Sequence, residues 1–254
     1  MSLLPDKNVF ITGASSGIGQ SCARAFAQEG SHLWLCARRQ DRLHALAEDL
    51  KAEFNAQVQT FALDVRDAKA VSDACATLPR VDVLVNNAGL SRGLVSVEEG
   101  LLSDWDEMIE TNVKGLLYVS RAVLPAMVKA GEGHVIHIGS IAGREVYPGG
   151  AVYCGTKYAV KAIAEGMRMD LCGTGVRVSC VDPGLVNTEF SRVRFHGDQA
   201  KADTAYQGMT PLSGEDVAES VLWVANRPPH VNVGDLLLLP ADQASAQRVH
   251  RRLS

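Results

Sequence analysis

A tyrosine and a lysine separated by three residues are the side chains of this sequence best suited to proton transfer. Tyr153 and Lys157 fall in the segment 150–172, whose residues favour a helix, so their spacing puts both on one helix face. A phenol with an ordinary pKa of about 10 is a poor base at neutral pH. A neighbouring ammonium group stabilises the phenolate and lowers that pKa. The pair therefore predicts a tyrosine that exchanges a proton with a substrate oxygen.

Ser140 is a second candidate for the same chemistry. It ends an apolar run at 134–140 that reads as a strand. In open α/β sheets, ligands bind at the carboxyl ends of the strands, which is where this hydroxyl is expected. Ser140 would donate a hydrogen bond to the substrate oxygen and stabilise the charge that develops there.

A glycine-rich turn near the N-terminus predicts a site for the phosphates of a nucleotide. The apolar run 9–13 leads into TGASSGIG at 12–19, which opens a helical pattern. The glycines permit a tight turn and let backbone amides approach a pyrophosphate at the helix N-terminus. A strand before the turn and a helix after it are the context that this motif requires. The residues expected at the cofactor are Gly13, Ser15, Ser16, Gly17, Ile18 and Gly19.

The elements that position these groups alternate between strand and helix along the whole chain. Several apolar runs have almost no polar residue, as expected for parallel strands covered on both faces. This alternation predicts an α/β fold: a doubly wound parallel sheet of Rossmann type, in three αβα layers, as one domain over residues 1–254. Strands are expected at 9–13, 32–37, 58–63, 81–87, 134–140, 176–184 and 235–240.

Two segments near the C-terminal end complete this outline. Residues 190–211 show no clear period and read as an irregular excursion, for which an active-site lid is the favoured interpretation. Ser213 followed by Asp216 is typical of a capped helix start, here before a helix over 217–225.

Composition and charge exclude several classes of function. The chain has 254 residues, of which 46% are hydrophobic, enough for a large core. Its net charge of −4 provides no field that would gather nucleic acid. No apolar run approaches the roughly 18 residues that span a bilayer, and the N-terminal segment does not resemble a signal peptide. We expect no nucleic-acid or membrane partner.

The six cysteines indicate a reduced, cytoplasmic protein without a metal site. They are scattered, with no C-x-x-C pair and no histidine at metal-ligand spacing. Most lie in apolar runs, where a free cysteine behaves as a small hydrophobic residue. Cys154 adjoins Tyr153, so a regulatory thiol is the alternative interpretation at that position.

Taken together, these motifs resemble the short-chain dehydrogenase/reductase family. The resemblance rests on T-G-x-x-x-G-x-G at 12–19, N-N-A-G at 86–89, Ser140, Tyr153-x-x-x-Lys157 and Pro183-Gly184, all in family order. It implies that Asn112 anchors a water that joins Lys157 to a proton relay, and that Lys157 also contacts the nicotinamide ribose. The further cofactor contacts that it implies are Asp64 and Val65 at the adenine, Asn86, Ala88 and Gly89 beside it, and Pro183, Gly184, Val186 and Thr188 at the nicotinamide.

The end of the second strand predicts NADP as the cofactor. An acidic residue there would bind the ribose hydroxyls of NAD, but the sequence has Ala37 followed by Arg38 and Arg39. A guanidinium group suits the extra phosphate of NADP because it donates paired, charge-assisted hydrogen bonds. Arg38 is the first candidate and Arg39 the second; alternatively, both begin a solvated turn.

Several segments resemble a narrower group, the NADP-dependent 3-hydroxy acid (serine-type) dehydrogenases. These segments are 121–127, 182–186, 188–191, 193–198 and 229–232. The resemblance implies oxidation of a 3-hydroxy acid to a semialdehyde or 3-oxo acid, and the reverse. Arg144, Arg192 or Arg194 could bind the substrate carboxylate, although each could also be a surface arginine. The alternatives are a reductase of 3-oxoacyl thioesters, sugars, steroids or broad carbonyl compounds, and a non-catalytic NADP-sensing regulator.

The resemblance also implies a homotetramer. Family members are commonly tetramers in which the helix that carries the tyrosine packs against its symmetry mate. Here that helix has more apolar residues than one core-facing stripe needs, and 236–239 supplies a second apolar patch. The alternative is a monomer with a deeply buried helix. The apolar helix residues are Val160, Ile163, Ala164, Met167 and Leu171.

Overall fold

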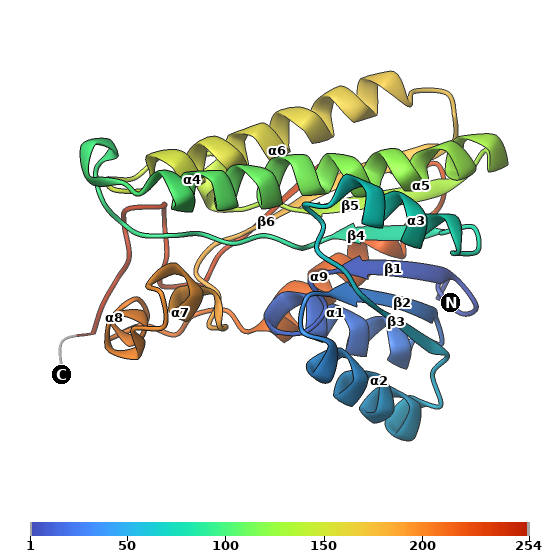
Figure 1. Cartoon of the computed structure of the whole chain (residues 1–254), viewed down its shortest axis with the longest axis horizontal. Coiled ribbons are helices and arrows are strands. Elements are labelled where there is room, and N and C mark those ends of the chain that lie inside the picture. The colour runs from blue at the N-terminus through green and yellow to red at the C-terminus, as the bar shows by residue number, and fades with distance from the viewer. Residues whose placement is uncertain (1, 253–254) are drawn as a thin grey trace.

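The computed structural model describes residues 2–252 and has one parallel sheet of seven strands in the order β3-β2-β1-β4-β5-β6-β7. The helices α1, α2 and α9 cover one face, and α3, α5 and α6 cover the other (Figure 1). The predicted three-layer, doubly wound fold is confirmed. The strands are β1 (Asn8–Thr12), β2 (His32–Ala37), β3 (Val58–Ala62), β4 (Val83–Asn86), β5 (Gly133–Ile138), β6 (Val176–Pro183) and β7 (Asp235–Leu238).

The helices follow the strands in regular alternation. Within the described chain, none is long and apolar enough to cross a membrane. They are α1 (Gly17–Gln28), α2 (Gln40–Phe54), α3 (Ala68–Ala76), η1 (Val97–Glu99), α4 (Leu102–Ile109), the π-helical η2 (Glu110–Gly115), α5 (Leu116–Ala130), η3 (Ile141–Gly143), α6 (Ala151–Asp170), α7 (Phe190–Arg194), α8 (Gln199–Thr204) and α9 (Gly214–Ala225).

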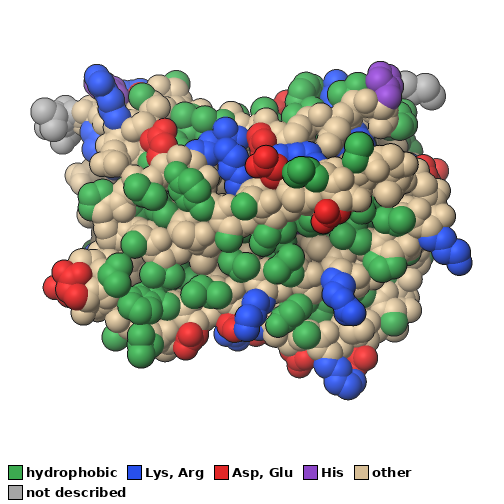
Figure 2. All heavy atoms as spheres, turned by 90° about the horizontal axis from the view of Figure 1, so that it is seen from above, with side chains coloured by type: hydrophobic (Ala, Val, Ile, Leu, Met, Phe, Trp, Pro, Cys, Tyr) green, Lys and Arg blue, Asp and Glu red, His purple; other side chains and the backbone are tan. Residues whose placement is uncertain are grey.

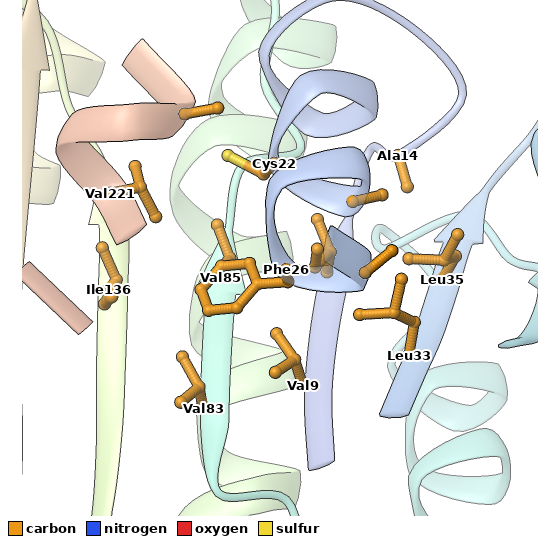
Figure 3. Packing of buried hydrophobic residues seen from close by; sticks show 14 of the residues in the cluster. Val9, Ala14, Cys22, Phe26, Leu33, Leu35, Val83, Val85, Ile136 and Val221 are labelled. Carbon is orange, nitrogen blue, oxygen red and sulfur yellow. The ribbon is translucent and has the colours of Figure 1, made fainter. Parts of the chain in front are cut away.

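The strands are apolar throughout because both of their faces are buried. In β1, Val9 and Ile11 point into the core under α1, α2 and α9, whereas Phe10 points into the core under α3, α5 and α6. Phe26 of α1 packs among the β1 and β4 side chains, as Figure 3 shows. Successive residues of a strand point to opposite faces of the sheet, so each strand contributes apolar side chains to both cores. This is why the strands appear in the sequence as unbroken apolar runs.

The helix boundaries follow from local chemistry. Gly30 comes two residues after the end of α1 with φ of 79°, a left-handed conformation that suits glycine at the end of a helix. Ser213 and Asp216 form the predicted capping box at the start of α9.

The segment 190–211 is more ordered than predicted. It contains two short helices, α7 and α8, which lie together outside the sheet (Figure 1). Asp198 caps α8 by accepting a hydrogen bond from the backbone amide of Lys201. Helices of five and six residues are too short to show a helical period, so the sequence suggested an irregular loop.

Candidate active site

A cavity of about 820 Å³ lies at the carboxyl ends of the strands and extends under α7 and α8. Small-molecule sites typically have volumes of about 300–1,000 Å³. The strand order reverses between β1 and β4, the position at which doubly wound sheets bind nucleotides. The cavity wall includes most of the predicted residues: Gly13, Ser15, Ser16, Gly17, Ile18, Arg38, Arg39, Asp64, Val65, Ala88, Gly89, Ser140, Tyr153, Lys157, Pro183, Gly184, Val186 and Thr188.

Two predicted cofactor contacts lie outside this wall. Asn86 is buried in β4, and its amide donates to Ser120 Oγ at 2.9 Å, so its side chain joins the sheet to α5. A Cβ atom on Gly19 would lie 2.5 Å from Asn87 Nδ2. Gly19 therefore allows α1 to pack against the loop after β4. For both residues the structure shows a role in holding elements together, and a direct contact with the cofactor stays a prediction.

The glycine-rich loop has the shape that a pyrophosphate requires. Gly13 and Gly17 adopt positive φ angles of 66° and 54°, and a Cβ on Gly13 would lie 2.9 Å from the backbone of Ala88. The N-cap residue Ser16 makes no side-chain hydrogen bond to the first turn of α1, which leaves backbone amides free to bind an anion. Thr12 Oγ1 accepts hydrogen bonds from the amides of Asn87 and Ala88 and holds the loop in place. The residues present therefore fit a dinucleotide.

The two arginines after β2 have different surroundings. Arg38 is half exposed and makes one long hydrogen bond of 3.4 Å, to Glu107. All three nitrogens of the Arg39 guanidinium are occupied by Ser15, Ser16 and Glu189, the last at 2.8 Å. Arg38 is therefore the more available guanidinium, in agreement with the predicted order of candidates.

Glu189 is a site residue that sequence reasoning missed. It immediately precedes α7 and also pairs with Arg42 at 2.7 Å. The hydrogen bond from Arg42 is the largest cause that lowers the pKa of Glu189, to about 2. Glu189 thus joins the base of α7 to the cofactor loop through Arg39. No sequence signal pointed to this contact, because its partners lie about 150 residues away in the chain.

Tyr153 is buried on α6, and two cations lie near its ring: Lys157 and Arg194. Burial raises the pKa of Tyr153, and both Arg194 and a hydrogen bond with Ser140 act in the opposite direction. The Arg194 guanidinium carbon lies 5.1 Å from the centre of the Tyr153 ring, whereas Lys157 Nζ lies 6.0 Å away. Arg194 is therefore the nearer cation and acts to lower the pKa of Tyr153, a contribution that the sequence did not predict; that Lys157 also lowers this pKa stays a prediction.

Lys157 points to the end of β5. Its ammonium group is buried and donates to the carbonyl oxygen of Ile138 at 2.8 Å. Burial lowers the pKa of Lys157 to about 8, although Cys180 and Asp182 act to raise it. The charge of this lysine is therefore sensitive to its neighbours near neutral pH.

Asn112 lies just behind the cavity wall, near Lys157. A Cβ on Gly89 would lie 3.2 Å from Asn112 Oδ1 and 3.7 Å from Lys157 Nζ. The Asn112 side chain accepts from the amide of Leu90 and donates to Thr156 Oγ1, which fixes the loop after β4 to α6. Asn112 lies in the π-helical turn η2, a feature often found at functional sites.

Only one of the three predicted carboxylate-binding arginines lines the cavity. Arg194 donates to Ser91 Oγ at 3.0 Å and to Tyr147 Oη at 2.9 Å, and its Nη1 has no hydrogen-bond partner among residues 2–252. Arg144 instead pairs with Asp182 at 2.7 Å, and Arg192 is half exposed beside Glu189. These contacts argue against Arg144 and Arg192 and favour Arg194.

Cys154 is also excluded as an accessible thiol in this conformation. Its side chain is fully buried next to Tyr153, and burial is the main cause of its raised pKa. A reactive cysteine needs exposure and a lowered pKa, so the structure supports a packing role for Cys154.

Comparison with known proteins identifies the family of this chain and several of its relatives. The family model for short chain dehydrogenases matches residues 7–199. An NADP-dependent 3-hydroxy acid dehydrogenase of Escherichia coli is 45% identical over 96% of this chain and 99% of its own. A sulfoacetaldehyde reductase of Chromohalobacter salexigens is 47% identical over 93% of this chain and 94% of its own. The closed form of a serine dehydrogenase complexed with NADP+ superposes with a TM-score of 0.90, at 45% identity, over 96% of this chain and all of that one.

Proposed function

Because this chain belongs to the short-chain dehydrogenase family, we propose that it is an NADP-dependent oxidoreductase that interconverts a short 3-hydroxy acid and its 3-oxo acid or semialdehyde. The predicted cofactor agrees with the NADP-dependent relatives and with the NADP+ complex. The observation that carries the substrate class is the position of Arg194. Its guanidinium group lies over the Tyr153 ring, inside the cavity.

The side chains of the cavity provide the proton and stabilise charge. NADPH, when bound, supplies the hydride for reduction. Burial raises the pKa of Tyr153, so this phenol holds its proton at neutral pH and acts as the acid toward the carbonyl oxygen. Ser140 donates to the same oxygen while negative charge develops on it. Arg194 and the more distant Lys157 then stabilise the phenolate. Lys157 and Asn112 lie close together beside Gly89, where they can return a proton to Tyr153.

The closeness of Arg194 to Tyr153 limits the length of the substrate. A substrate oxygen at the Tyr153 hydroxyl leaves its carboxylate within reach of Arg194 only if a few atoms separate the two groups. This supports a short oxo acid over 3-oxoacyl thioesters, sugars and steroids. Arg194 is carried by α7, so we also propose that residues 190–211 form the lid over this site.

A panel of carbonyl compounds tests the proposal. NADPH oxidation, followed by absorbance, is compared for a short 3-oxo acid, an aldehyde acid, sulfoacetaldehyde, a neutral ketone and a 3-oxoacyl thioester, each also with NADH. We expect turnover with the short acids and NADPH. Sulfoacetaldehyde is the second candidate, because a guanidinium group also binds a sulfonate and one relative is named for that activity. Binding of NADPH with no turnover on any compound would favour a regulator.

Cofactor choice provides a separate prediction. Ala37→Asp combined with Arg38→Ala should weaken NADPH binding and relatively favour NADH, because a phosphate partner is lost and a repulsive carboxylate is gained. Arg39→Ala is the matched comparison: since Arg39 holds Ser15, Ser16 and Glu189, its loss should weaken both cofactors together. Fluorescence titration measures all four affinities for each variant. Wild-type preference for NADH would contradict the assignment.

We propose that the protein is a homotetramer, but that its interface is formed by other residues than those predicted from the sequence. Val160 and Ala164 are buried in the core, and Ile163, Met167 and Leu171 pack against it, so this stripe is used within one chain. Leu237 is the most exposed of the residues 236–239, and Leu236 and Leu238 of β7 pack against the core beneath α1, α2 and α9. Figure 2 shows the face that bears α4, α5 and α6, where hydrophobic side chains lie between scattered charges. The exposed large hydrophobic residues of these three helices are Leu102, Ile109, Leu117, Val128, Tyr158 and Met169.

Light scattering coupled to size exclusion tests this assembly. We expect a mass near four times the 27.2 kDa of one chain at micromolar concentration, because self-complementary apolar patches favour closed symmetric oligomers. Leu117→Arg should lower the measured mass, because it places a charge in the proposed interface. The apolar stripe of α6 is not part of this interface, since it is already packed in the core of one chain. A wild-type mass of one chain would contradict the tetramer.

A cytoplasmic location also remains part of the proposal. All six cysteines are within the described chain and unpaired, as is usual in a reducing compartment.

A further inference from the structure

Asp182 is a buried carboxylate at the catalytic end of β6. Only 1% of it is exposed, and three groups converge on its oxygens. The Ser140 amide donates to Oδ1 at 3.2 Å, Arg144 Nε donates to Oδ2 at 2.7 Å, and the Cys180 thiol lies 3.1 Å from Oδ1. Burying a carboxylate is costly even when it is paired, so its position next to the site calls for a functional reason.

The contacts of Asp182 hold both ends of the turn that carries Ser140. Ser140 comes immediately before η3 and Arg144 immediately after it, and the two bind different oxygens of the same carboxylate. The backbone also packs directly on this group, because a Cβ on Gly139 would lie 1.9 Å from Asp182 Oδ1. The direction of the Ser140 hydroxyl therefore depends on Asp182.

Asp182 and Lys157 both lie at the end of β5: Lys157 Nζ donates to the carbonyl oxygen of Ile138 at 2.8 Å, and Asp182 Oδ1 packs against the next residue, Gly139. The titratable groups around this lysine are Tyr153 on α6, His137 on β5, and Cys180 and Asp182 on β6. Burial lowers the pKa of His137 to about 3 and raises that of both Tyr153 and Cys180, so these three are neutral at pH 7. Asp235 on β7 lies within 4.8 Å of Asp182 and Cys180 but is exposed and pairs with Arg168. Asp182 is therefore the buried carboxylate that balances the ammonium ion.

We infer that Asp182 is a positioning residue of the reaction: its carboxylate fixes the Ser140 turn and provides the negative charge beside Lys157. The role in turnover rests on the proposed function, but the effect on Lys157 does not. The charge can therefore be tested in the protein without cofactor or substrate.

The test is the pH dependence of Lys157 acetylation by acetic anhydride, read by mass spectrometry. Asp182→Asn keeps the size of the side chain and removes its charge, so the midpoint of Lys157 labelling should move to lower pH. Glu145→Gln is the matched control, since it removes an exposed acid next to the same turn and should leave the midpoint unchanged. An unmoved midpoint in Asp182→Asn would overturn the inference.

Two further measurements keep the test decisive. Should Asp182→Asn fail to fold, Asp182→Asn with Arg144→Gln removes both members of the ion pair and leaves neither charge unpaired. The midpoint should still fall, because the carboxylate beside Lys157 is gone. In folded Asp182→Asn, reductive kcat near pH 8 should fall about tenfold, the scale of one pKa unit, with KM little changed. A shifted midpoint with no wild-type turnover would refute the proposed function and leave the charge effect standing.

Discussion

Tyr153→Phe should lower turnover by about 100-fold or more, the usual range for loss of a general acid, while NADPH still binds. The substitution keeps the ring that packs against Phe190 and beneath Arg194 but removes the hydroxyl that donates the proton. Steady-state reduction of the preferred substrate gives kcat, and fluorescence titration gives the affinity for NADPH.

Tyr158→Phe is the matched control for this variant. Tyr158 is on the same helix, is 43% exposed, and its hydroxyl donates to the carbonyl oxygen of Arg144 outside the cavity. It should keep turnover close to that of the wild type. Undiminished turnover in Tyr153→Phe would refute the assignment of the acid.

Arg194→Met should lower kcat/KM for carboxylate-bearing substrates much more than for a neutral ketone, which loses only the effect of Arg194 on Tyr153. Removing one partner of a desolvated charge pair costs about 2 kcal/mol or more, which corresponds to roughly 30-fold in rate. Methionine keeps much of the length of the side chain without its charge. The ratio of kcat/KM values for the acid and for the ketone therefore isolates the interaction with the carboxylate.

Arg192→Met controls for loss of positive charge on α7. Arg192 is half exposed, lies 3.7 Å from Glu189 and is not part of the cavity wall, so the acid-to-ketone ratio should stay unchanged. An equal fall for acid and ketone in Arg194→Met would indicate that Arg194 acts only through Tyr153 or the fold of α7.

The parts of the fold predicted from sequence are those with a strong local signal. Parallel strands buried on both faces give apolar runs, so every strand was located within a few residues. The Tyr153–Lys157 pair and the glycine-rich turn were found because their spacing is fixed by a single helix or turn. The capping box of α9 is likewise contained in four residues.

The parts that were missed depend on contacts between distant residues. Glu189 and Arg39 are 150 residues apart in the sequence, and Asp182 and Arg144 are 38 apart. No local sequence pattern therefore predicts either contact. The position of Arg194 over Tyr153 depends on how α7 folds back onto the cavity. The apolar stripe of α6 suggested an interface, but only the structure shows that the sheet already buries it.

Hydride transfer itself is the central claim, and deuterium transfer measures it most directly. NADPH deuterated at the reactive carbon of its nicotinamide ring is incubated with the enzyme and a short 3-oxo acid, and the product is analysed by mass spectrometry. The proposed function predicts a 3-hydroxy acid that carries deuterium at its new carbinol carbon, with far less formed by Tyr153→Phe. A protein that binds NADPH but yields no deuterated alcohol from any carbonyl in the panel would contradict it.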